Sequence, residues 1–328
     1  MPLRSTESKL GSDDRKMSTV DVGFAVSLLT HAVQAGTPLL LATVDEIYSE
    51  RSGVLNLGLE GIMIMGALAC FLISFRTGDI ALAIVAAALV GALLSLIHAF
   101  LSITLKANQI VSGLAISIFG LGVSGFLGKP LIGQTINRLQ QTPIPLLREI
   151  PILGPIFFSG DILLYLSIVV SVVMWFVLFR TKLGLNIRSV GENPSMADSL
   201  GVNVDLTRYA CVLVGGTLGG LGGAYLSIVY TPLWIEGMSA GRGWIAIALT
   251  IFAMWNPLRA ILGAYLFGGI IALQFRLQAI GIGTETPQLL LMLPYVITIG
   301  TLVVMSSAVL KKRLGVPAAL GTPYVRGE

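Results

Sequence analysis

Apolar runs of membrane-spanning length follow one another along most of this chain. A helix needs about 20 apolar residues to cross a bilayer, so most of these runs predict a transmembrane helix. The pattern predicts an all-α integral membrane protein whose transmembrane domain covers residues 21–312. We expect nine clear spans, at about residues 22–44, 59–75, 80–105, 108–127, 162–179, 209–230, 243–255, 258–279 and 289–310.

Two polar loops interrupt the spans. Residues 128–161 are rich in proline, which excludes a continuous helix there. Within residues 181–208, Asn193 and Pro194 indicate a helix start, because Asn can cap free backbone N–H groups and Pro at the first position loses no hydrogen bond. Gly201 indicates the end of that helix. A helix of about two turns is not stable alone in water, so we expect it to lean on another surface.

The segment 46–58 is a third interruption. Gly53, Gly58 and Asn56 stand where a lipid-facing helix would have leucines. Non-helical backbone is tolerated at membrane depth only where protein or water covers it. We therefore expect a broken crossing here that lines an interior path.

The basic residues bear on the topology. With nine crossings and an inside N-terminus they divide ten inside to eleven outside, against the positive-inside rule. With a tenth, broken crossing at 46–58 they divide fourteen to six, with Arg51 unassigned. We therefore expect about ten crossings and both termini in the cytoplasm. Residues 1–20 then form a disordered cytoplasmic leader and residues 313–328 a cytoplasmic tail, with loop 181–208 cytoplasmic and loop 128–161 outside.

Composition agrees with a membrane protein. The chain is 55% hydrophobic and only 12% charged, with a mean hydropathy of +0.86, whereas soluble domains carry about 25% charged residues. The net charge of +4 forms no basic stripe, so we expect no nucleic-acid partner.

Enzyme chemistry finds no support in the motifs. No GxxxxGK[ST] sequence occurs, so the chain cannot cradle ATP phosphates by itself. The two histidines, His31 and His98, and the two cysteines, Cys70 and Cys211, are scattered over apolar segments. We therefore expect no metal site, no cofactor and no catalytic residue. The glycines of residues 215–223 overlap as GxxxG pairs, which allow helix backbones to approach closely in lipid.

Two stretches, one starting at Gly61 and the other at Gly243, share an order of apolar span, short polar turn and small-residue span. In a ten-crossing topology they run in opposite directions, the pattern of an inverted repeat whose interface commonly holds substrate. Apolar sequence also aligns with itself easily, so both interpretations stay open.

Glu60 is an ionisable residue at membrane depth. Such a residue is a functional candidate, either as a proton or cation relay or as a partner for Arg51 or Arg242. Trp234 and Trp244 fit an aromatic belt at the membrane interface, or a surface on which a ring-bearing solute stacks.

Residues 49–67, 190–204 and 241–268 together resemble the permease subunits of ABC importers for nucleosides and simple sugars, in the branched-chain amino acid and ribose permease superfamily. The resemblance implies a type II-like ABC importer fold in the bacterial inner membrane. It also implies cytoplasmic ATP-binding subunits, a second permease subunit, an extracytoplasmic solute-binding protein and contact with membrane lipid.

The resemblance further implies that the short helix of loop 181–208 sits in a groove of the ATPase. The residues at the matching positions are Gly191, Glu192, Asn193, Pro194, Ala197, Gly201 and Val202. An amphipathic surface helix that touches lipid headgroups is the alternative, but the acidic Glu192 and Asp198 disfavour it.

We expect alternating access, in which the binding protein docks on the outer loops and a neutral solute enters an interior path. The side chains expected to line this path are Asn56, Glu60, Asn108, Gln109, Ser112, Trp234 and Trp244. The tryptophans favour a nucleoside over an amino acid, with a simple sugar next. The alternative is an ion-coupled secondary transporter that uses Glu60.

Overall fold

The structure is a computed structural model that describes residues 7–281, 287–305 and 315–325, with side chains from residue 23 onward. The described chain is helical apart from its loops and one isolated bridge between Thr135 and Leu233. The helices are α1 (Glu7–Arg51), α2 (Leu59–Thr77), α3 (Ile80–Ala99), α4 (Gln109–Gly128), α5 (Leu153–Phe157), α6 (Ile162–Arg180), α7 (Lys182–Glu192), α8 (Pro194–Ser199), α9 (Val204–Tyr225), α10 (Arg242–Phe252), α11 (Pro257–Ala279), α12 (Pro287–Leu291) and α13 (Leu293–Met305).

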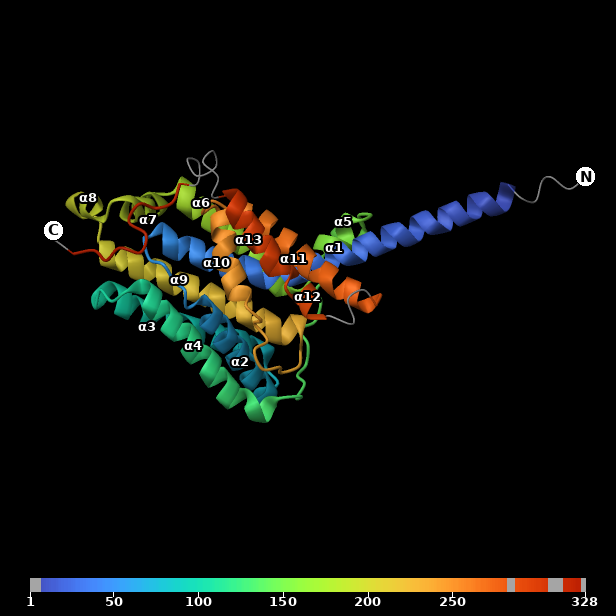
Figure 1. Cartoon of the computed structure of the whole chain (residues 1–328), viewed down its shortest axis with the longest axis horizontal. Helices are drawn as coiled ribbons and strands as arrows, with labels where there is room; N and C mark the ends of the chain where they lie inside the picture. Colours follow the sequence, from blue (N-terminus) through green and yellow to red (C-terminus); the bar gives the residue numbers. More distant parts are fainter. Residues whose placement is uncertain (1–6, 282–286, 306–314, 326–328) are drawn as a thin grey trace, which may run out of the picture.

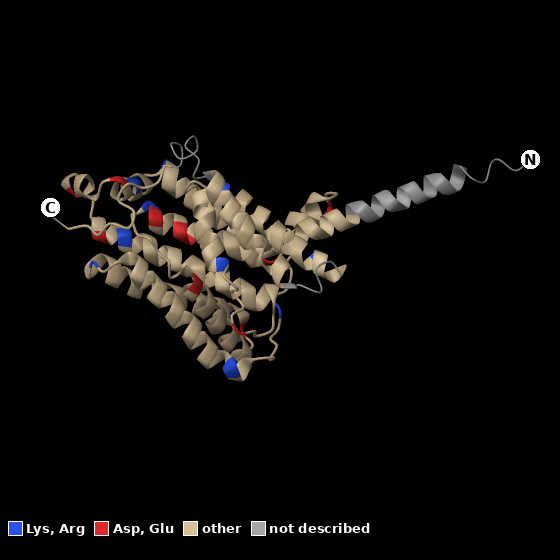
Figure 2. Cartoon of the chain, viewed as in Figure 1, with Lys and Arg blue, Asp and Glu red and all other residues tan. Residues whose placement is uncertain are grey.

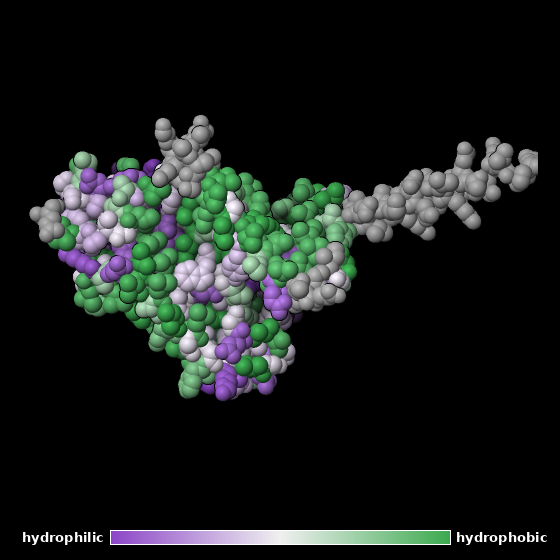
Figure 3. Space-filling view, in the orientation of Figure 1, coloured by the Kyte–Doolittle hydropathy of each residue, from purple (hydrophilic) through white to green (hydrophobic). Residues whose placement is uncertain are grey.

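Seven helices of the described chain are long and apolar enough to cross a membrane: α1, α2, α3, α4, α6, α9 and α11. Short π-helical turns extend α3 through Thr104 and α9 through Tyr230. Two shorter apolar helices lie in residues 242–252 and 288–304. The all-α membrane fold is therefore confirmed. Figure 3 shows hydrophobic surface over the middle of the bundle and hydrophilic patches at the end that carries α7 and α8.

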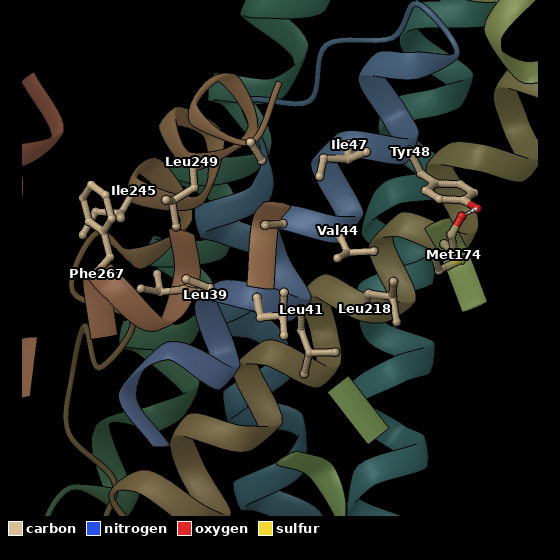
Figure 4. Close-up of a cluster of buried hydrophobic side chains, with 14 of the residues drawn as sticks. Leu39, Leu41, Val44, Ile47, Tyr48, Met174, Leu218, Ile245, Leu249 and Phe267 are labelled. Carbon is tan, nitrogen blue, oxygen red and sulfur yellow. Dashed lines mark hydrogen bonds between the residues drawn. The ribbon is translucent and has the colours of Figure 1, made fainter. Parts of the chain in front are cut away.

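Helix α1 runs through the centre of the bundle and packs along α9, α10 and α11 (Figure 1). Its buried face supplies Leu39, Val44 and Ile47 to a core that includes Leu218 of α9 and Phe267 of α11 (Figure 4). In the same core the hydroxyl of Tyr48 donates to the carbonyl of Met174 at 2.6 Å, which ties α1 to α6.

Glycines let α9 approach α2 and α3 as closely as backbones can. A Cβ on Gly91 of α3 would lie 2.2 Å from the carbonyl oxygen of Gly216, and one on Gly66 of α2 would lie 2.5 Å from that of Gly220. Without a hydrophobic force between helices in lipid, such close packing is a main source of association. The packing role expected for residues 215–223 is confirmed.

The proline-rich loop 128–161 ends in a buried N-cap. Asp161 accepts from the backbone N–H of Leu164 at 3.0 Å and from the hydroxyl of Tyr225 at 3.2 Å. Burial raises the pKa of Asp161, and these hydrogen bonds to the charged carboxylate act in the opposite direction. The cap fixes where the loop re-enters the bundle.

The non-helical backbone expected in the polar segment 46–58 is present but shorter, at residues 52–58. Helix α1 continues unbroken to Arg51, and only residues 52–58 leave the helical path before α2 begins. Neighbours bind two acids of this helix: Glu46 accepts from the backbone N–H of Asn56 at 3.1 Å, and Glu50 accepts from the indole N–H of Trp255.

The two described ends of the chain lie at opposite ends of the bundle, whereas we expect both termini on one side (Figure 1). About midway along its length α1 contacts the proline-rich loop, where the Thr30 hydroxyl donates to the carbonyl of Pro155. At its other end Arg51 donates to the carbonyl of Gly315, in the C-terminal segment. The number of about ten crossings stays a prediction, because seven described helices have membrane-spanning length and further apolar helices are shorter. Helix α1 is also helical from Glu7, inside the segment 1–20 for which we expect disorder.

Candidate functional site

Two non-helical stretches, residues 52–58 and 231–241, each lead into a helix that begins inside the bundle, α2 and α10. The N-terminal ends of these two helices touch. A Cβ on Gly243 would lie 2.5 Å from the backbone nitrogen of Glu60, so glycine is needed there. This contact brings the two segments of the candidate repeat together, as an interface between repeats would.

The carboxylate of Glu60 joins the two helix ends. One oxygen accepts from the hydroxyl of Ser239 at 2.5 Å and from the backbone N–H of Gly241 at 2.9 Å, and the other accepts from the N–H of Gly243 at 2.7 Å. The side chain is 3% exposed. The two arginines expected as its partners bind backbone carbonyls instead in the described chain. Arg242 donates to the carbonyls of Met238 and Ser239, and Arg51 donates to the carbonyl of Trp255.

Side chains satisfy the backbone of residues 52–58 almost group by group. Non-helical backbone inside a membrane protein requires such partners. The bonds are Leu55 N–H to Gln109 (2.8 Å), Asn56 N–H to Glu46 (3.1 Å), Gly58 N–H to Asn56 (3.0 Å), Ser117 hydroxyl to the Leu57 carbonyl (2.8 Å) and Arg208 to the Ser52 carbonyl (3.1 Å).

His98 completes this support. Its Nε2 lies 3.0 Å from the carbonyl oxygen of Leu55, which can only accept, so Nε2 carries the proton. Its Nδ1 then accepts from the hydroxyl of Ser112 at 3.0 Å. This buried histidine therefore holds the backbone of residues 52–58 in place.

Four of the seven expected path residues therefore gather at these stretches: Asn56, Gln109 and Ser112 around residues 52–58, and Glu60 at the helix junction. Three do not join them. Asn108 is exposed and caps α4 by accepting from the N–H groups of Ile110 and Val111. Trp234 is buried against Phe71, with ring centroids 5.6 Å apart, and Trp244 is 39% exposed on α10. Solute contact by all seven residues stays a prediction.

Sequence reasoning missed the polar face of α1. Asp45 and Ser49 are fully buried, and glycines of α9 lie against them: a Cβ on Gly215 would lie 2.3 Å from a carboxylate oxygen of Asp45. In the described chain several buried polar atoms of this region have no hydrogen-bond partner: both carboxylate oxygens of Asp45, one of Glu46, the Ser49 hydroxyl and the amide nitrogens of Asn56 and Gln109. The spacing of Asp45, Glu46, Ser49 and Glu50 on an apolar helix was the available signal.

The short helix at the other end is confirmed as α8. Asn193 accepts from the N–H of Met196 at 2.9 Å, Pro194 is the first helical residue, and Gly201 takes a positive φ of +86° where the helix has ended. The preceding α7 (Lys182–Glu192) was not predicted. Ala197 is buried with Val190 and Val204, and Val202 packs on them.

One side of α8 is exposed to solvent in the described chain. Glu192 and Asn193 are exposed, and so are two large apolar side chains, Met196 at 62% and Leu200 at 78%. An exposed apolar pair on a capped helix is a surface suited to a protein partner. This face stays a prediction as the ATPase contact.

The C-terminal segment 315–325 ties α7 to residues 52–58. The N–H of Ala319 donates to the carbonyl of Gly191 at 2.9 Å, and the N–H of Gly321 donates to the carbonyl of Gly53 at 3.2 Å. Gly191 lies directly against α1, since a Cβ there would be 2.2 Å from the carbonyl oxygen of Arg51. Figure 2 shows charged residues gathered at this end of the bundle and others inside it.

Comparison with known proteins decides the family. The family model described as "Branched-chain amino acid transport system / permease component" matches residues 27–309. The chain belongs to this permease family. Members of this family are ABC transporter permeases, so the chain is a multi-pass permease subunit and not an enzyme, with ATP hydrolysed in a separate subunit.

Three relatives of this permease cover almost its full length. It is 41% identical to the "Putative glucose ABC transporter permease protein TsgC13" of Haloferax volcanii, over 93% of this chain and 99% of the relative. It is 38% identical to the guanosine permease NupQ of Bacillus subtilis and to the nucleoside permease NupC of Lactococcus lactis, each over 89% of this chain and 94% of the relative. A second Bacillus subtilis guanosine permease, NupP, is 21% identical over 71% of this chain. No solved structure matches.

Proposed function

We propose that this permease subunit imports a neutral solute, a nucleoside first and a simple sugar next, by alternating access. The observation that carries the proposal is near full-length similarity to two nucleoside permeases and one permease named for glucose. Nucleosides and glucose share a ring that bears hydroxyl groups and carries no charge, so one path lined by hydrogen-bonding groups can serve either.

The path runs past residues 52–58 and the junction of α2 and α10. Buried atoms without a partner in the described chain, such as the amide nitrogens of Asn56 and Gln109, are costly unless another state of the protein satisfies them. A solute hydroxyl or base edge passing along α1 would supply that partner. Glu60 is no ion-coupling site in this proposal, because three protein donors already satisfy its carboxylate.

Helix α8 couples the path to the ATPase. In the proposal its exposed face, with Met196 and Leu200, sits in a groove of a cytoplasmic ATP-binding subunit. Motion of α8 reaches residues 52–58 through α7, since Gly191 contacts both Arg51 and the C-terminal segment. ATP binding and hydrolysis would thus reshape the stretch that lines the path.

The proposed assembly contains two ATP-binding subunits, an extracytoplasmic solute-binding protein that docks on the outer loops, and a second permease subunit. Bacillus subtilis has two guanosine permeases that both resemble this chain, which supports a pair of similar but distinct permeases.

Reconstitution in proteoliposomes tests the proposal. Liposomes with the whole importer should take up labelled guanosine or glucose only when ATP is enclosed with the ATPase subunits. Uptake that continues without ATP while an ion gradient is kept would instead identify an ion-coupled transporter. Liposomes without this chain are the control and should show no uptake.

A further inference from the structure

The junction of α2 and α10 places two helix N-termini against each other inside the protein. Each N-terminus carries free N–H groups and about half a positive charge, so it binds anions. Here the N–H groups of Gly241 and Gly243, at the start of α10, meet the carboxylate of Glu60, which stands in the first turn of α2. Residues 58–60 and 239–243 together form what we name the anion cradle.

A buried base adds to the positive field of the cradle. Arg242 is the first residue of α10 and is 8% exposed, and its Nε has no hydrogen-bond partner in the described chain. Its guanidinium lies 5.2 Å from the centre of the Tyr230 ring and lines a cavity of about 220 Å³ between α10, α11 and α13. Together with the two helix ends it makes the region electropositive.

The cradle already holds an anion, the side chain of Glu60. Both of its carboxylate oxygens are bonded, at 2.5 to 2.9 Å, to donors that come from the opposite helix end. Hydrogen bonds of this kind to a charged acceptor are among the strongest in proteins. A second carboxylate or phosphate at the same place would meet a like charge in a site closed to water.

We propose that Glu60 sets the charge selectivity of this permease by filling the anion cradle, so that solutes bearing a carboxylate find no site while uncharged solutes pass. The selectivity part rests on the proposed function, because it places the solute path at this junction.

Removing the Glu60 side chain and supplying acetate, which has the size and charge of the part removed, tests the cradle. Glu60→Ala removes a methylene and a carboxylate, which acetate matches in size and charge. We expect the purified importer with Glu60→Ala to unfold at a lower temperature, and acetate to raise its midpoint by at least about 2 °C, since a ligand that binds only the folded state stabilises it. Gluconate at equal ionic strength should have no such effect.

Three comparisons sharpen the acetate titration. The unsubstituted importer should not respond to acetate, because its cradle is full. Glu60→Gln should not respond either, because the amide fills the space that acetate needs. Glu236→Ala removes an exposed acid from the same loop and should behave like the unsubstituted importer. If Glu60→Ala folds only when purified in acetate, that also supports the cradle.

An absence of any acetate effect on Glu60→Ala, or its failure to fold even in acetate, would overturn the proposal. The titration needs no solute, so it separates this inference from the proposed function. Uptake is the second measurement: acetate should restore part of the nucleoside or sugar uptake that Glu60→Ala loses. If acetate stabilises the variant while even the unsubstituted importer carries neither solute, the cradle stands and the proposed function fails.

Discussion

Gly191 of α7 lies against the carbonyl oxygen of Arg51 at the end of α1, so closely that a Cβ on Gly191 would be 2.2 Å from that oxygen. This contact joins α7 directly to α1, the helix that precedes residues 52–58. The same glycine accepts from Ala319 in the C-terminal segment. Any movement of α8 therefore has a short, backbone-to-backbone route into the bundle.

Gly191→Ala should break that route. The added methyl group meets backbone rather than a flexible side chain, so α7 must shift away from α1, at about 1–3 kcal/mol for overpacking. We expect lower thermal stability and a weaker stimulation of ATP hydrolysis by the solute-loaded binding protein. Gly122→Ala on α4 is the control, since a Cβ there would have no neighbour within 4 Å and Ala favours a helix. Equal stimulation in both variants would argue against the route.

Asn193→Ala removes the cap of α8, and loss of a cap costs about 1 kcal/mol. For a helix of six residues this loss should loosen the whole surface that carries Met196 and Leu200. We expect the variant to retain less ATP-binding subunit during purification. Asn193→Ser keeps a capping oxygen and should retain as much as the unsubstituted chain. If the Ala and Ser variants retain the same amount, the cap plays no part in assembly.

Gln109→Ala leaves the partly buried N–H of Leu55 without its acceptor. An unsatisfied buried donor costs about 1–3 kcal/mol, so residues 52–58 should lose their fixed path. We expect a lower unfolding midpoint and reduced uptake, both measured on the reconstituted importer. Gln288→Ala changes an exposed residue of α12 and should leave both unchanged. Normal uptake by Gln109→Ala would show that these residues do not line the path.

Gly91→Ala tests the packing of α3 on α9. Its methyl group would meet the carbonyl oxygen of Gly216 at 2.2 Å, so the two helices must separate. Because association in lipid depends on close contact, we expect the free energy of unfolding to fall by about 1–3 kcal/mol. The midpoint of thermal unfolding should fall with it. Gly269→Ala meets only the Cβ of Ala32, at an ordinary 3.7 Å, and is the matched control. Similar midpoints for the two variants would contradict this account.

Local patterns predicted much of this molecule. Apolar runs located the spans, since only helices satisfy their own backbone groups in lipid. Asn193 before Pro194, with Gly201 behind them, located α8, because capping depends on neighbours in sequence. The motifs at 49–67, 190–204 and 241–268 carried the family, which the comparison confirmed.

Topology was harder to predict, because charge counting sums over loops and cannot see partners across the fold. Gly53, Asn56 and Gly58 indicated a break, and residues 52–58 do leave the helical path. Glu46 and Glu50 nevertheless lie within an unbroken α1, where Asn56 and Trp255 bind them. Because α1 is unbroken, the two described ends of the chain lie at opposite ends of the bundle (Figure 1).

The candidate site depended most on tertiary structure. The sequence by itself determined that Glu60 is an acid at membrane depth and that Gly241 and Gly243 begin the motif 241–268. Only the fold decided that the carboxylate is bound by N–H groups about 180 residues further along the chain, and that Trp234 packs on Phe71. The physical reason is that hydrophobic periodicity reports which face of a helix is buried, whereas a hydrogen bond between two distant helix ends depends on how those helices meet in space.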